Sequence, residues 1–307
     1  MPALMMAAVL ASCNNMDDAA QQASSRALDV NVSVNDVNSR AMVYGTTLDE
    51  GEIIGVSVTA ADGGAYDGST TGYLNVAYTG GVAGANQPWT GASDILLSGT
   101  EGKAYAYYPY TAGTDFTAIA VNVVDQKDWM YSGAGITVSD AASDVQFQLS
   151  HAQTALAVTV ARGNKYTGTG AVTAFTVTSD GLAKTGTLHA GTGAWSGVAG
   201  AGTAISISDA FTLTVDDAST TNVKESEKTL SYMLIPASAG VCDFTVNMTL
   251  DGKPYSATVG IEEAFTAGKV YKVSLNFDNE KLNVNKVVVL NDWAGVDLDE
   301  GTLTPVQ

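Results

Sequence analysis

The residue with the clearest potential for chemistry near the start of the chain is Cys13, because a cysteine thiol is a nucleophile that can be modified covalently. It ends the run Leu10-Ala11-Ser12-Cys13 and follows the uncharged stretch from Pro2 to Ser12. Small residues directly before a cysteine are typical of a bacterial lipobox, in which the thiol receives a diacylglyceryl group. We therefore expect residues 1–13 to be a lipoprotein signal segment, lipidated on Cys13, and residues 14–26 to be a polar spacer. The alternative is an apolar N-terminus with an incidental cysteine.

Residues that could perform catalysis or bind a metal are sparse. The chain has two histidines, His151 and His189, and neither lies in a motif for a metal site or for a nucleophile with its base. Asp297, Asp299 and Glu300 could supply oxygen ligands to Ca²⁺, but the run lacks the pattern of known calcium loops, so a solvated acidic turn is favoured. We therefore predict no enzyme activity, no metal and no cofactor.

A cluster of four tyrosines could serve binding instead of catalysis: Tyr105, Tyr107, Tyr108 and Tyr110. Aromatic faces suit the apolar surfaces of sugar rings, so the cluster could stack on a glycan. Core packing at a sheet corner is the alternative and is favoured. The glycine-rich run at residues 191–197 lacks the spacing of a phosphate-binding loop and predicts a β-turn.

Composition sets the size and class of the protein. The chain has 307 residues, of which 46% are hydrophobic, so it can form two domains with sizeable cores. Its 32 acidic and 14 basic residues give a net charge of -18, and the pI is about 4.2. This balance repels phosphate backbones and disfavours nucleic acid as a partner.

The elements that position these residues are strands. Leu28, Val30, Val32 and Val34 alternate with polar residues, which predicts a strand with one buried and one solvated face. The alternation recurs over 145–149 and 271–277, and residues 244–250 and 255–261 flank Asp251-Gly252 as in a tight hairpin. Since sustained helical spacing is absent, we expect β-sandwiches. The length calls for two domains, and the small, polar stretch from Val138 to Ser143 places their boundary near residue 140, which gives an N-terminal domain at 27–140 and a C-terminal domain at 141–307.

Several motifs, in this order along the chain, resemble the fimbrillin family of Bacteroidales type V pilins. They are the lipobox-like run ending at Cys13, Ser39-Arg40-Ala41, Gly51-Glu52-Ile53-Ile54-Gly55-Val56, the tyrosine-rich run 104–110, Phe147 to Ala152, Tyr271 to Leu275, and Asp292-Trp293. The resemblance implies an all-β fold of two tandem β-sandwich domains, mostly antiparallel, with a Greek-key-like, transthyretin-like topology. It also implies a non-enzymatic subunit of a cell-surface fimbria that serves adhesion.

The resemblance further implies an assembly mechanism. A protease cuts after an arginine, releasing the first strand, and a strand of another subunit fills the exposed groove by β-strand addition. Arg40, followed by Ala41, fits the cut better than Arg26, because Arg26 precedes the removable strand formed by Leu28, Val30, Val32 and Val34. The candidate donor strand carries Val296, Leu298, Leu303 and Val306. The partners are then other pilin subunits, the outer membrane through the lipid on Cys13, and a host protein or glycan.

Two alternatives stay open at the level of sequence. The protein could be a monomeric surface lipoprotein that binds glycans, or Arg40 could be an ordinary solvated turn residue in an anchor subunit that is not processed. A tip subunit would not need to donate a strand. The motifs do not distinguish stalk, anchor and tip roles.

Overall fold

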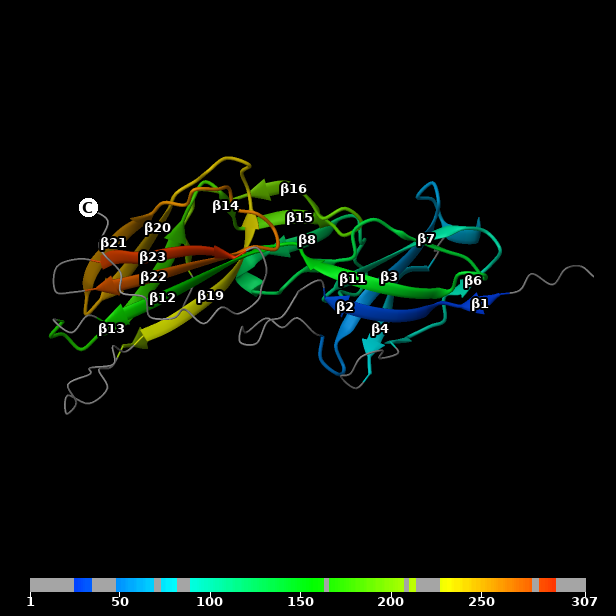
Figure 1. Cartoon of the computed structure of the whole chain (residues 1–307), viewed down its shortest axis with the longest axis horizontal. Coiled ribbons are helices and arrows are strands. Elements are labelled where there is room, and N and C mark those ends of the chain that lie inside the picture. The colour runs from blue at the N-terminus through cyan, green and yellow to red at the C-terminus, as the bar shows by residue number, and fades with distance from the viewer. Residues whose placement is uncertain are drawn as a thin grey trace, which may run out of the picture.

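The computed structural model describes residues 25–34, 48–68, 73–81, 89–162, 166–206, 210–213, 227–277 and 282–290. In these ranges the chain is nearly all strand and turn, with two short 3-10 helices, η1 (Tyr66–Gly68) and η2 (Val123–Asp125), and no α-helix. Two bodies of β-structure lie end to end along the long axis (Figure 1). The predicted all-β, mostly antiparallel fold is confirmed.

The first body is an eight-stranded sheet that closes on itself. Its order is β10-β7-β3-β4-β5-β2-β11-β9, and β7 also pairs with β9. The strands are, in that order, Ile136–Val138, Gly102–Tyr108, Ile53–Ala60, Tyr73–Gly80, Trp89–Gly91, Asp29–Val34, Asp144–His151 and Met130–Tyr131. Beside it, β1 (Arg26–Ala27) pairs with β6 (Leu96–Leu97). Closure leaves fewer unpaired sheet edges than an open sandwich has.

The second body contains two five-stranded sheets. The first has the order β14 (Leu182–Ala183), β19 (Glu227–Pro236), β12 (Thr154–Arg162), β22 (Val270–Phe277), β23 (Leu282–Leu290). The second has the order β17 (Ile205–Ser206), β13 (Ala171–Thr178), β20 (Phe244–Leu250), β21 (Lys253–Val259), and β18 (Phe211–Thr212) also pairs with β13. Buried side chains from both sheets form one core, so this body is a sandwich.

The hairpin predicted around Asp251-Gly252 is confirmed. Strands β20 and β21 pair antiparallel from Phe244 with Val259 to Leu250 with Lys253. Asp251 has φ 47° and Gly252 has φ 76°, the left-handed conformations that a tight hairpin turn requires.

The two bodies do not divide where the sequence suggests. Strand β11, which begins after the expected boundary at residue 140, pairs with β2 and β9 in the first body. The pairing changes only between β11 and β12, across Ala152 and Gln153. In addition, β8 (Ile119–Asn122) joins β15 (Thr185–His189) and β16 (Ala194–Ala199) in a three-stranded sheet located between the bodies (Figure 1). Alternation alone shows that a strand exists but not which sheet it enters.

Candidate functional site

Strand β2 (Asp29–Val34) and Leu28, directly before it, place the predicted removable residues largely as expected. Leu28 is 6% exposed, Val30 0% and Val34 9%, and all three belong to the core of the first body. Val32 is only partly buried and packs against the margin of that core. Asp29 and Ser33 are exposed on the opposite side of the strand. The two-residue period therefore predicts the inward face of β2 correctly, although it overstates the burial of Val32.

Strand β2 is an interior strand of the sheet, with unequal pairing on its two sides. Against β11 it forms six consecutive parallel pairs, from Asp29 with Asp144 to Val34 with Leu149. Against β5, within the described residues, it forms one antiparallel pair, Val30 with Trp89. We call the position of β2 between β5 and β11 the β2 slot. Removing β2 would expose two facing strand edges and the core between them.

The beginning of β2 is held by backbone hydrogen bonds outside these ladders. The amide of Leu28 donates to the carbonyl of Ile95 at 2.9 Å, and the amide of Asp29 donates to the carbonyl of Ser143 at 2.9 Å. Just before it, Nη2 of Arg26 lies 3.4 Å from Oδ1 of Asp144, and both side chains are more than half exposed. An ion pair this exposed contributes little stability.

The β5 side of the slot is lined by aromatic rings packed on glycines. A Cβ at Gly80 would lie 3.1 Å from two carbons of the Trp89 ring, and a Cβ at Gly91 would lie 3.0 Å from the Tyr78 ring. Burial, with the Asp94 and Asp29 carboxylates nearby, raises the pKa of Tyr78 to about 12. Tyr78 therefore stays a neutral hydroxyl at physiological pH.

The other predicted site residues lie outside the described residues. These are Cys13, Arg40, Ala41, Val296, Leu298, Leu303 and Val306, and also the acidic group Asp297, Asp299 and Glu300. In the part of the chain that the structure describes, His, Cys, Asp and Glu side chains nowhere gather in groups of three or more that could bind a metal ion. No helix of that part is long and apolar enough to cross a membrane.

The tyrosine cluster does not form an open stacking surface. Tyr107 is completely buried and its hydroxyl donates to Oδ1 of Asn75 at 2.7 Å. The Tyr105 ring packs against Phe116, with 5.0 Å between centroids. The hydroxyl of Tyr108 donates to Oε2 of Glu52 at 2.9 Å, and this contact, together with burial, raises the pKa of Tyr108. Packing and hydrogen bonding, the favoured alternative, account for Tyr105, Tyr107 and Tyr108, while Tyr110 is partly buried.

The connection between the two bodies is a buried polar junction that the sequence does not reveal. The amide of Ala152 donates to the carbonyl of Trp129 at 2.7 Å, and Nε1 of Trp195 donates to the carbonyl of Ala152 at 2.9 Å. The amide of Trp129 donates to Oε1 of Gln153 at 3.0 Å, and Gln153 is 1% exposed. Buried groups satisfied in this way fix a single geometry, so the connection is not a free linker.

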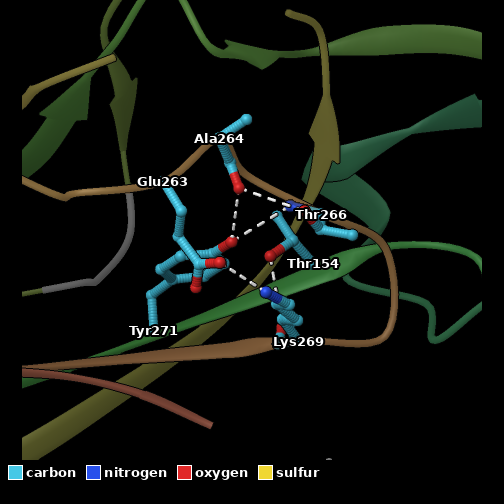
Figure 2. A network of polar contacts seen from close by, with 6 residues as sticks. All are labelled: Thr154, Glu263, Ala264, Thr266, Lys269 and Tyr271. Atoms are coloured by element: carbon cyan, nitrogen blue, oxygen red, sulfur yellow. Dashed lines mark hydrogen bonds and ion pairs between the residues drawn. The ribbon is translucent and has the colours of Figure 1, made fainter. Parts of the chain in front are cut away.

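The loop before β22 continues this junction into the second body (Figure 2). The carbonyl of Lys269 accepts from Oγ1 of Thr154 at 3.2 Å, which fixes the start of β12. Nζ of Lys269 lies 2.5 Å from Oε2 of Glu263. The Tyr271 hydroxyl donates to the carbonyl of Ala264 at 2.7 Å and accepts from the amide of Thr266 at 3.1 Å. The site thus consists of the β2 slot in the first body and a hydrogen-bonded junction that connects this body to the second.

Solved structures share this fold. A candidate cell adhesion protein from Bacteroides ovatus has a TM-score of 0.63 at 21% identity, with 89% of this chain and 100% of that chain covered. One from Bacteroides uniformis has a TM-score of 0.60 at 17% identity, with coverage of 86% and 97%. One from Bacteroides fragilis has a TM-score of 0.53 at 10% identity, with coverage of 89% and 100%. At these identities the similarity concerns the fold.

Sequence comparison identifies the family. A comparison with curated protein sequences finds no match. The profile of the fimbrillin-like family, in contrast, matches residues 39–293, which is most of the chain. The chain therefore belongs to the fimbrillin-like family.

Proposed function

We propose that the protein is a pilin or adhesin subunit of a cell-surface fimbria and that it assembles by exchanging β2 for a strand of a neighbouring subunit. The family is structural and not enzymatic, as the sequence predicts. The observation that supports strand exchange is the β2 slot: an N-terminal strand fills the apolar core between β5 and β11. The strand precedes Arg40 in the chain.

A cut between Arg40 and Ala41 would separate β2 from the rest of the protein, because residue 40 follows the whole strand. A cut after Arg26 would leave β2 attached, since Arg26 lies in β1, ahead of β2. Only the first cut makes the β2 slot available to another chain. Arg40 is accordingly the proposed processing site.

The burial of β2 explains why an emptied slot would bind a replacement strand. Leu28, Val30 and Val34 each contribute about 1.5 to 3 kcal/mol through burial. Together they amount to roughly 5 to 9 kcal/mol, close to the whole stability of a typical domain, about 5 to 15 kcal/mol. Because β2 is paired on both sides, we expect it to leave only as an incoming strand takes over its pairs.

The incoming strand is proposed to come from the C-terminal region of the neighbouring subunit. In sequence, Val296, Leu298, Leu303 and Val306 follow β23, which lies at the edge of its sheet in the part of the chain that the structure describes. In an extended strand Val296 and Leu298 face the same side, so they would fill two of the pockets that β2 would vacate, and main-chain hydrogen bonds would supply the pairing. The lipid on Cys13 would hold the unprocessed precursor at the outer membrane.

Digestion with an arginine-specific protease tests this function. The full chain, cut at Arg40, should form ladders of oligomers on size-exclusion chromatography and denaturing gels. The variant Arg40→Ala should stay monomeric under the same digestion, whereas Arg26→Ala should oligomerise like the unaltered protein. Oligomers that form equally from Arg40→Ala would refute processing at Arg40.

A further inference from the structure

The inward side chains of β2, and Leu28 directly before it, differ in how fully the slot encloses them. Val30 is 0% exposed, whereas Leu28 and Val34 keep 6% and 9% exposure and Val32 is only partly buried. Among the described residues, Val30 is also the residue of β2 that pairs on both sides, with Val145 on β11 and Trp89 on β5. It is therefore the most fully enclosed of these side chains.

The side chains that surround Val30 are tightly packed. Residues that face each other across paired strands have their Cβ atoms about 5 Å apart, so the Trp89 side chain borders Val30 directly. The Trp89 ring already rests on Gly80, where even a Cβ would come within 3.1 Å of it. On the other side Val145 is 2% exposed and Phe147 is 0% exposed. A larger side chain at position 30 would have to displace one of these packed groups.

The register that places a residue at this position is well defined. Six consecutive pairs with β11 fix β2 along its length. A shift by one residue would turn Asp29 and Asn31 toward the core and Val30 toward solvent, because strand side chains alternate. In this register, the same position of every incoming strand therefore lies next to Trp89.

We propose that the β2 slot discriminates between incoming strands chiefly at the position of Val30, where it accepts a valine-sized β-branched side chain and excludes aromatic ones. The position of Val32 tolerates larger side chains because it lies at the margin of the core. This inference rests on the proposed strand exchange. In this proposal the Trp89 ring, which packs on Gly80, is the group that excludes larger side chains.

Peptide exchange into the cleaved full chain tests the selectivity. Fluorescent peptides with the sequence of residues 27–36 are added in excess to the protein cut at Arg40, and incorporation is measured by anisotropy and gel filtration. The matched variants Val30→Phe and Val32→Phe make the same change at the tight and the tolerant position. Overpacking of a core costs about 1 to 3 kcal/mol, or roughly 5- to 150-fold in binding. We expect Val30→Phe to bind at least about 10-fold more weakly than the native peptide, and Val32→Phe to stay within about threefold.

Each result has a distinct meaning. Equal binding of the two variants, with the native peptide entering normally, would overturn the selectivity and leave strand exchange standing. A native peptide that never enters would overturn strand exchange itself, and the selectivity with it. As a second measurement that needs no exchange, the uncut Val30→Phe protein should melt at a lower temperature than uncut Val32→Phe. The opposite order would contradict the tight enclosure of Val30.

Discussion

Nδ1 of His151 lies 2.9 Å from Oδ1 of Asp128, and the two side chains are 2% and 8% exposed where the first body meets the second. His151 ends β11, and the neighbouring residues Trp129 and Gln153 are hydrogen-bonded to each other. The pair thus belongs to the buried junction that joins the bodies.

Loss of this buried pair should destabilise the whole protein. Removing one partner of a buried hydrogen bond costs about 1 to 3 kcal/mol, because the remaining group is left desolvated. Asp128→Ala should therefore lower the free energy of unfolding by about 1 to 3 kcal/mol in denaturant titrations. The control is Asp144→Ala, which removes the exposed pair with Arg26 and should cost about 1 kcal/mol or less. Equal losses would contradict the structural role of the junction.

The two bodies should unfold together. Tyr107 and Trp129, from the first part of the chain, pack in the core of the second body. We expect one heat-absorption peak for the full chain in scanning calorimetry, with equal calorimetric and van't Hoff enthalpies. Gln153→Ala should lower the melting temperature and broaden or split this peak. Two separate peaks in the unaltered protein would show that the junction does not couple the bodies.

Substitution by alanine should be more costly at Gly193, in the turn between β15 and β16, than at Gly197, which lies within β16. A Cβ at Gly193 would lie 2.1 Å from the Tyr131 ring, whereas a Cβ at Gly197 would approach nothing closer than 3.9 Å. Both glycines have positive φ, 71° and 56°, so alanine is strained at each. Gly193→Ala should therefore cost about 1 to 3 kcal/mol more than Gly197→Ala in thermal unfolding. Similar costs would mean that Tyr131 does not pack tightly on this turn.

Low pH should lower the stability of the second body, because it protonates the Asp251 carboxylate. Its carboxylate accepts from the Tyr166 hydroxyl at 2.6 Å, from the amides of Gly170 and Ala171 at 2.9 Å each, and from the Thr169 hydroxyl. The Thr169 and Tyr166 hydroxyls hold the pKa of Asp251 well below its usual range. Because the pKa is lower in the folded state than in the unfolded chain, where it is about 3.9, this stabilisation is present above about pH 4 and is lost as the pH falls further.

Asp251→Asn provides the matched variant, because asparagine tolerates the same left-handed backbone conformation. The fall in melting temperature between pH 6 and pH 3 should be smaller for Asp251→Asn than for the unaltered protein. An equal fall in both would exclude Asp251 as a source of the acid sensitivity.

Local patterns predicted individual strands but not their partners. The alternation at Leu28 to Val34 and the Asp251-Gly252 turn are short-range signals, and both elements form as expected. The pairing of β7 with β9 and the assignment of β11 to the first body depend on contacts between distant segments. The junction was missed for the same reason, since nothing in the sequence around Asp128 or Gln153 indicates which buried group each one meets.

Strand replacement itself is tested most directly by the composition of purified oligomers. After digestion at Arg40, denaturing mass spectrometry should detect chains that begin at Ala41 and lack the fragment that contains β2. Hydrogen exchange should at the same time show β11 (Asp144–His151) still protected, because a strand of a neighbouring copy has taken the pairs of β2. Oligomers that retain one β2 fragment per chain would contradict the account, since the slot would then never have changed its occupant.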